Sequence, residues 1–157
     1  MFTLQQLKEF LLASNKAGYA GGEEKKLVKE PDGSTTIPFR AEAWRSNDNF
    51  FGGEPYGGRV VVFFENKPVW IMVYYGWVVE GEDANEVYTI LRQALGQMPD
   101  NYPYRGPEKL VEGEFVYQNS WNGELDRYTG EEIITKSGKE IYRATYLGGL
   151  VDIRGGV

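Results

Sequence analysis

An apolar run from Val69 to Val79 constrains the fold more than any other part of the sequence. Its first seven residues are mostly β-branched or aromatic, which favours a strand over a helix. Both faces of that strand are apolar, so we expect it at the sheet centre, with helices covering one face and loops or a partner covering the other. The run spans 11 residues and is too short for a membrane-spanning helix, which needs roughly 20.

Further strands are predicted on the N-terminal side of this run. Residues 39–44 and 60–64 are rich in β-forming side chains, and the turn-forming residues 65–68 connect the second of them to the central run as a hairpin. We expect the polar residues 47–49 to separate the two strands. The glycine-rich residues 51–58 are expected to hold no regular structure.

Two hairpins are predicted in the C-terminal half. Asn122-Gly123 is the strongest short turn signal in the chain, and a return strand is expected at residues 125–128. The second hairpin places strands at residues 133–136 and 140–147 around Ser137-Gly138. The strand before the first turn is indicated by alternating side chains at Phe115, Tyr117, Asn119 and Trp121.

Two helices are indicated by apolar residues at helical spacing. The first covers about residues 4–17, with Thr3 and Gln6 as a capping box and Gly18 as its stop. The second is capped by Asp83 with Glu86 and ends at Pro99. Its apolar stripe comprises Val87, Leu91, Ala94, Leu95 and Met98.

This order of elements predicts one α+β domain over residues 1–157, a mainly antiparallel sheet with both helices packed on one face. A flexible polar loop is expected at about residues 22–37, and a disordered tail at about 152–157. An edge strand at residues 39–44 or in the last hairpin offers a surface for a homodimer, although Arg40, Glu42 and Arg45 equally suit edge protection.

Composition excludes several kinds of chemistry. The chain has neither Cys nor His, which removes thiol nucleophiles, Ser-His-Asp triads and His- or Cys-ligated zinc. With 23 acidic and 17 basic residues its net charge is −6, so we expect no nucleic-acid partner. The N-terminus has no secretory pattern and no membrane partner is indicated, which makes a cytoplasmic location the expectation.

Short motifs give no catalytic, metal or cofactor assignment. Residues 53–58 have the glycine spacing of a phosphate-binding loop, but Arg59 and a strand follow where Lys and a helix are required. Residues 47–52 resemble a calcium loop only faintly, since Phe51 stands at a ligand position. Most carboxylates of an acidic protein are solvated, so Glu132 and its neighbours are expected at the surface.

Tyr and Trp residues cluster around glycines, which suits either a pocket or simple packing on the sheet. The candidate ligand-binding residues lie on one face of the central strand and in the proline-bounded loop at residues 100–107. Arg105 would bind an anionic or carbonyl group, or else anchor that loop by a salt bridge or by backbone hydrogen bonds. The candidates are Trp70, Met72, Tyr74, Tyr104 and Arg105.

Several segments together resemble the bacterial domain of unknown function 5680 family, which occurs alone and fused behind helix-turn-helix regulators. They are Tyr19-Ala20-Gly21-Gly22, Phe51-Gly52-Gly53 with Tyr56-Gly57, Pro68-Val69-Trp70 with Met72 and Tyr74-Tyr75-Gly76, Pro103-Tyr104-Arg105-Gly106-Pro107, and Gly148-Gly149. Similar chains tend to carry Asn in place of Val73 and an acid in place of Arg59. The resemblance implies a sensor or dimerisation unit, and DNA binding does not transfer because the helix-turn-helix part is lacking.

Three functions remain open from the sequence. The first is a non-enzymatic domain that binds a small molecule or acts as a sensor, which predicts a concave aromatic pocket. The second is an acidic protein-interaction module of the inhibitor or immunity type, which predicts an acidic patch and no pocket. The third is a carboxylate- or Tyr-dependent enzyme, which requires a buried acid with a raised pKa in a cleft.

Overall fold

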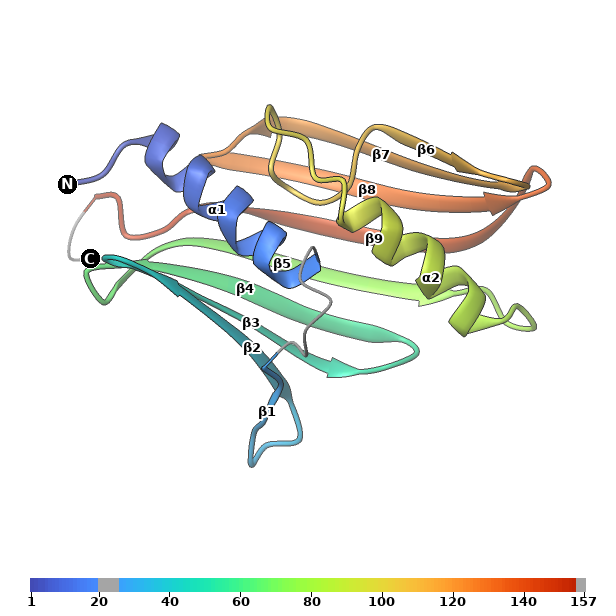
Figure 1. Cartoon of the computed structure of the whole chain (residues 1–157), viewed down its shortest axis with the longest axis horizontal. Helices are drawn as coiled ribbons and strands as arrows, with labels where there is room; N and C mark the ends of the chain where they lie inside the picture. Colours follow the sequence, from blue (N-terminus) through green and yellow to red (C-terminus); the bar gives the residue numbers. More distant parts are fainter. Residues whose placement is uncertain (20–25, 155–157) are drawn as a thin grey trace.

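A computed structural model describes residues 1–19 and 26–154. All nine strands in this part of the chain form one antiparallel sheet in the order β1-β2-β3-β4-β5-β9-β8-β7-β6, and two helices accompany it (Figure 1). The predicted α+β class is confirmed. The elements are α1 (Leu4–Tyr19), β1 (Val28–Lys29), β2 (Thr35–Ala41), β3 (Trp44–Gly52), β4 (Tyr56–Phe64), β5 (Lys67–Val78), α2 (Ala84–Leu95), β6 (Lys109–Glu112), β7 (Phe115–Glu124), β8 (Arg127–Lys136) and β9 (Lys139–Leu150).

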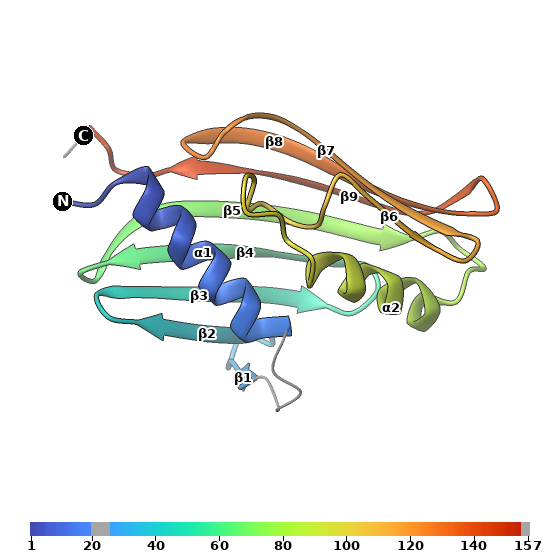
Figure 2. The ribbon, with the colours of Figure 1, turned by 45° about the horizontal axis from the view of Figure 1, so that its top comes forward.

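The central position of the apolar run is confirmed, because β5 is the fifth of nine strands. Strands β1–β5 form one meander and β6–β9 another, and the pairing of β5 with β9 joins them into one sheet (Figure 2). Helix α2 and the loop after it lead from the first meander to the second. The predicted turn at Ser137-Gly138 is also confirmed, since it connects β8 to β9.

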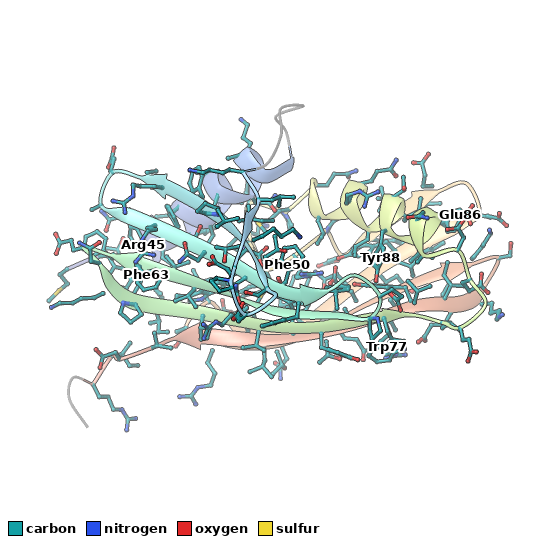
Figure 3. All side chains as sticks on the ribbon, turned by 90° about the horizontal axis from the view of Figure 1, so that it is seen from below. Arg45, Phe50, Phe63, Trp77, Glu86 and Tyr88 are labelled. Atoms are coloured by element: carbon teal, nitrogen blue, oxygen red, sulfur yellow. The ribbon has the colours of Figure 1, made fainter. Side chains whose placement is uncertain are left out.

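Both helices lie across the same face of the sheet, here called the inner face (Figures 1 and 2). Side chains alternate along β5, so Trp70, Met72 and Tyr74 are buried beneath the helices. On the outer face Val73 is 45% and Tyr75 52% exposed, and Trp77 lies on the side away from the helices (Figure 3). The described residues therefore cover only one of the two apolar faces of β5.

The helix caps follow the sequence signals, but the helix ends do not. Thr3 and Gln6 form the predicted capping box, with Gln6 N donating to Thr3 Oγ1 at 3.2 Å and Thr3 N donating to Gln6 Oε1 at 2.8 Å. Gly18 is no stop, because α1 continues to Tyr19. Asp83 caps α2 as predicted, whereas that helix ends at Leu95 and leaves Met98 outside.

The interpretation of residues 39–44 as one strand is wrong. Ala41 pairs with Trp44 across a turn at Glu42 and Ala43, so this stretch joins β2 to β3. Residues 47–49 lie within β3, because their polar side chains find partners there; Asn49 Nδ2 donates to Ser34 Oγ at 2.8 Å and to Thr36 Oγ1 at 3.0 Å. The glycine-rich residues 51–58, expected to hold no regular structure, are partly in strands, since β3 ends at Gly52 and β4 begins at Tyr56.

Two further expectations differ from the structure. The first C-terminal hairpin turns at Leu125 and Asp126, three residues after the predicted turn, and Gly123 lies inside β7. The loop predicted at about residues 22–37 contains β1 and the first residues of β2. A turn joins these two strands, and in it Asp32 Oδ1 accepts a hydrogen bond from Ser34 N at 3.0 Å. Residues 22–25 of that loop and 155–157 of the predicted tail lie outside the described residues.

The described parts of the chain include no helix with both the length and the apolar character required to cross a membrane.

Candidate functional site

A cavity of about 360 Å³ lies between the inner face of the sheet and the two helices. Its floor comes from β2–β5, and its walls come from the C-terminal half of α1, the chain just after α2 and the following loop. The structure brings all five candidate residues to this cavity: Trp70, Met72, Tyr74, Tyr104 and Arg105. Their role in binding a ligand stays a prediction.

Most of the cavity surface is apolar, and its polar groups are few. Ser14 and Ser46 share a hydrogen bond of 3.1 Å between their Oγ atoms, and Asn15 Nδ2 donates to the carbonyl oxygen of Leu95 at 3.1 Å. Lys26 contributes an exposed ammonium. The apolar lining comprises Leu11, Ala17, Ile37, Pro38, Phe39, Val60, Trp70, Met72, Leu95, Met98 and Pro103.

Asp48 and Tyr74 form a polar pair on the cavity floor. The Tyr74 hydroxyl donates a hydrogen bond to Asp48 Oδ1. Burial, and then the Asp48 carboxylate, raise the pKa of Tyr74 far above its ordinary value, so the phenol stays protonated at neutral pH. Sequence reasoning missed Asp48 because the polar stretch around it resembled a turn; its position opposite Val60 in β4 places it on the inner face.

Arg105 lies deep in the site and makes the salt bridge that the sequence left open. Its Nε donates to Glu132 Oε1 at 2.5 Å, and Nη2 donates to the Tyr56 hydroxyl at 3.3 Å. Burial by itself disfavours the charged guanidinium, but the Glu132 carboxylate holds the pKa of Arg105 well above its ordinary range. Arg105 is therefore a permanent cation at the cavity wall.

Glu132 contradicts the expectation of a surface carboxylate, since its side chain is fully buried. Its second oxygen, Oε2, accepts a hydrogen bond from the Tyr117 hydroxyl at 2.5 Å. A buried carboxylate needs such partners because an unpaired one is strongly disfavoured. No signal in the sequence separates Glu132 from its partly exposed neighbour Glu131.

The contacts of Arg105 with the described residues engage only part of its guanidinium. Within residues 1–19 and 26–154, no hydrogen bond engages Nη1. The guanidinium carbon lies 5.3 Å from the centre of the Tyr74 ring, which places the group beside the polar pair on the floor. Arg105 itself lines the cavity.

The loop that carries Tyr104 and Arg105 is fixed to the sheet. Gly106 N donates to the Tyr117 hydroxyl at 3.2 Å, and the Gly106 carbonyl accepts from Asn119 Nδ2 at 2.9 Å. The Tyr104 ring stacks on Tyr128 with the ring centres 4.1 Å apart. These contacts hold both candidate side chains in place at the cavity wall.

Glycines give the inner-face tyrosines room to lie against the sheet. Tyr74 pairs across β4 and β5 with Gly58, where a Cβ atom would come within 2.7 Å of the Tyr74 hydroxyl oxygen. Tyr56 pairs in the same way with Gly76. The clustering of Tyr with Gly in the sequence is the signal of this arrangement, and by itself it fits either a pocket or packing on the sheet.

Two other hollows differ in character from the cavity. One of about 410 Å³ lies on the outer face under the β1–β2 turn, and its lining includes Asn47, Asn49 and Arg59. The other lies beside β7 and is lined by Tyr102 and Trp121 among others. Over the described residues, no group of three or more acidic side chains is arranged to hold a metal ion.

Comparison of the chain with curated proteins and with solved structures gave no match. A family model does match, that of the domain of unknown function DUF5680, over residues 48–151. The matched region begins at Asp48 in β3 and ends just after β9, so it contains all five candidate residues together with Glu132. Because the match spans more than half of the chain, this protein belongs to the DUF5680 family.

Proposed function

We propose that this chain is a non-enzymatic domain that binds a small organic molecule in the cavity beneath its two helices, as a carrier or sensor would. One observation carries the proposal: a cavity of about 360 Å³ with a largely apolar lining and a few convergent polar groups. Sites for small molecules have this size and this composition. The interaction alternative anticipated an acidic patch without a pocket, so the cavity favours the first function.

A non-enzymatic role is supported by the state of the ionisable groups. Arg105 and Glu132 are paired with each other, and Tyr74 remains protonated at neutral pH. Neither arrangement offers a free base or a nucleophile. The third function would depend on Asp48, a carboxylate that lines the cavity.

The test uses N-phenyl-1-naphthylamine, an uncharged dye that fluoresces in apolar surroundings. We expect saturable binding with one site per chain. Val60→Trp places a large side chain in the cavity and should abolish the signal. Val73→Trp is the matched control, because Val73 lies on the outer face of the neighbouring strand and is 45% exposed.

Both variants are first compared with the unsubstituted chain by thermal unfolding, because partly unfolded proteins also bind apolar dyes. Loss of saturable binding in the folded Val60→Trp variant, with retention in Val73→Trp, supports the proposal. Equal binding by all three proteins, or no saturable binding by the unsubstituted chain, overturns it.

A further inference from the structure

We infer that this chain is an internal duplication, in which two copies of one unit pair with each other as the subunits of a symmetric dimer do. Each unit is a helix followed by a four-stranded meander: the first comprises α1 and β2–β5, and the second comprises α2 and β6–β9 (Figure 1). The short strand β1 is an addition to the first unit. The inference concerns the architecture that holds the cavity, and it does not depend on a bound ligand.

The pairing of the last two strands of each unit is the first line of evidence. Strand β5 begins at Lys67, β9 begins 72 positions later at Lys139, and both strands have 12 residues. Adding 72 to each residue number in the register of β4 with β5 reproduces the register of β8 with β9 at every pair. The irregularity that follows Val62 in β4 recurs after Ile134 in β8. Antiparallel pairing by itself does not require an irregularity at the same place in both hairpins.

The other strands repeat at an offset of 71 residues. Adding 71 to the residue numbers of β2 and β3 gives the register of β6 with β7 at every pair that β6 forms. The offset changes by one because three residues connect Gly52 to Tyr56, whereas four connect Gly123 to Tyr128. Gly52 and Gly123 are equivalent, and both have a positive φ, of 77° and 98°. A single extra residue in one turn therefore accounts for the difference between the two offsets.

The contacts between tyrosine and glycine on the inner face repeat as well. Tyr74 lies opposite Gly58 in the first unit, and Tyr146 lies opposite Gly130 in the second. A Cβ atom would come within 2.7 Å of the Tyr74 hydroxyl oxygen at Gly58, and within 2.1 Å of Tyr146 Cζ at Gly130. Both glycines thus leave room for a tyrosine ring at the same place in the two units.

The hydrogen bonds of these two tyrosines are also equivalent. The Tyr74 hydroxyl donates to Asp48 Oδ1, and the Tyr146 hydroxyl donates to Asn119 Oδ1 at 2.7 Å. Asp48 in β3 and Asn119 in β7 occupy equivalent positions, 71 residues apart. Sheet geometry alone explains a shared register, whereas the same side-chain contacts at the same positions indicate that the two units are copies.

Strands β5 and β9 pair in such a way that a half-turn exchanges the two units. Tyr74 lies opposite Tyr146, its own equivalent, and the pairs on either side are exchanged in the same way. This is the register of an isologous interface, in which the same patch of each subunit contacts its copy. The rotation axis is perpendicular to the sheet, which is why both helices lie on one face (Figure 2).

The two units differ where the cavity lies. The floor of the cavity in the first unit includes Ser46 and Val60. The equivalent residues of the second unit are Tyr117 and Glu132, which are both fully buried. Glu132 accepts hydrogen bonds from Tyr117 and from Arg105. The open cavity therefore belongs to the first unit, and the buried ion pair occupies the equivalent floor of the second.

One contact between the units lacks its symmetric counterpart. Tyr56 in the first unit and Tyr142 in the second share a hydrogen bond of 2.5 Å between their hydroxyl oxygens. The equivalent residues are Tyr128 in the second unit and Trp70 in the first. The buried Tyr128 hydroxyl has no hydrogen-bond partner among the described residues. The duplication explains this unpaired group, because position 70 holds Trp where the second unit has Tyr142.

The test restores the missing bond with Trp70→Tyr and detects it in a double-mutant cycle with Tyr128→Phe. In the unsubstituted chain Tyr128→Phe removes an unpaired hydroxyl and should raise the urea midpoint. In the Trp70→Tyr background the Tyr128 hydroxyl gains a partner, so Tyr128→Phe should lower the midpoint. The cycle subtracts the separate cost of Trp70→Tyr, which loses the hydrogen bond from Trp70 Nε1 to the Leu125 carbonyl oxygen.

Trp44→Tyr provides the matched background. Trp44 is also buried on the inner face, but its ring contacts Phe2, Phe10 and Phe64. In this background Tyr128→Phe should still raise the urea midpoint, because the Tyr128 hydroxyl remains unpaired.

Two circular permutants test the inference if Trp70→Tyr does not fold. Both join residues 151–157 to residues 1–3, which makes a link longer than the one at residues 79–83 between β5 and α2. One permutant begins at Glu82 and exchanges the order of the two units, and the other begins at Gly138 and divides the second unit. The first should have the higher urea midpoint, because each helix stays connected to its own meander and its contacts stay local.

The outcomes decide the inference without reference to a ligand. A midpoint that Tyr128→Phe lowers only in the Trp70→Tyr background supports the duplication. A midpoint that it raises or leaves unchanged there, or lowers equally in the Trp44→Tyr background, overturns it. A permutant beginning at Glu82 that is no more stable than the one beginning at Gly138 also overturns it. The proposed function is tested separately by the dye.

Discussion

At the scale of single residues, the ion pair of Arg105 and Glu132 is the most consequential contact, because both side chains are buried. Removing one partner leaves the other charge uncompensated, and we expect Arg105→Met to lower the free energy of unfolding by about 3–5 kcal/mol. The double variant Arg105→Met/Glu132→Met removes both charges and should recover most of that loss. Urea denaturation measures both effects.

The control for this prediction is an exposed pair. Lys139 is 3.2 Å from Glu82 and mostly exposed, so Lys139→Met should change the urea midpoint very little. An Arg105→Met variant as stable as Lys139→Met would show that the buried pair does not matter for folding. A double variant less stable than Arg105→Met would show that the uncompensated charge of Glu132 is not the cause of the lost stability.

Gly130 is a second residue at which a small change should have a large effect. A Cβ atom there would lie 2.1 Å from Cζ of Tyr146, whose ring is buried and whose hydroxyl donates to Asn119 Oδ1 at 2.7 Å. The ring cannot move aside cheaply, so Gly130→Ala should lower the free energy of unfolding by about 1–3 kcal/mol. Gly53→Ala is the control, because a Cβ atom at Gly53 meets nothing within 4 Å. Similar urea midpoints for the two variants would contradict this reading.

At the scale of elements, the local sequence correctly predicts Asp83 as the N-cap of α2. Asp83 accepts hydrogen bonds from the backbone N–H of Asn85 at 2.9 Å and of Glu86 at 3.4 Å. Asp83→Ala should cost about 1 kcal/mol of the free energy of unfolding, whereas Asp83→Asn keeps an acceptor and should cost much less. Equal losses in urea denaturation would mean that the carboxylate acts through its charge rather than as a cap.

The elements that sequence reasoning located correctly are those with local determinants. Capping pairs, the apolar run of β5 and the turn at Ser137-Gly138 all depend on neighbouring residues. The turn expected at Asn122-Gly123 was displaced by tertiary contacts: Leu125 is buried, and its carbonyl oxygen accepts from Trp70 Nε1 at 3.0 Å. A partner 55 residues away cannot be read from a dipeptide.

In the candidate site, too, the residues that sequence reasoning identified have local determinants, and those that it missed depend on distant contacts. Trp70, Met72 and Tyr74 were identified because alternation along a strand reveals which side chains share a face. Asp48 and Glu132 were missed because their partners are distant in sequence: Tyr74 lies 26 residues from Asp48, and Arg105 lies 27 residues from Glu132. A buried carboxylate is recognised by its partners, which only the folded chain brings together.

At the scale of the whole molecule, the sheet carries a layer of buried tyrosines across its inner face. Burial raises the pKa of these phenols, in the case of Tyr104 to about 12. An unfolded tyrosine loses its proton near pH 10, so above that pH the folded state binds more protons than the unfolded state. The free energy of unfolding should therefore be unaffected by these groups below about pH 9 and should fall from about pH 10 upward. The group comprises the buried Tyr74, Tyr104, Tyr117, Tyr128, Tyr142 and Tyr146 and the partly buried Tyr56.

Tyr128 offers a variant that isolates this effect. Its hydroxyl is buried and has no hydrogen-bond partner among the residues that the structure describes. Burial raises the pKa of Tyr128 far above its ordinary value. Tyr128→Phe removes both the unpaired hydroxyl and one titrating group. We expect it to raise the free energy of unfolding by about 1 kcal/mol at neutral pH and to make the decline above pH 10 shallower.

The comparison variant is Tyr146→Phe, which also removes a buried titrating phenol but breaks its hydrogen bond to Asn119. Its free energy of unfolding should be lower than that of the unsubstituted chain at neutral pH, because a buried hydrogen bond is lost. Above pH 10 the free energy of unfolding should likewise fall less steeply, because the slope depends on the number of buried phenols that titrate. Urea midpoints between pH 7 and 11.5, with tyrosinate absorbance recorded in parallel, separate the two quantities. If both variants keep the slope of the unsubstituted chain, the layer of buried tyrosines is not the source of its sensitivity to alkali.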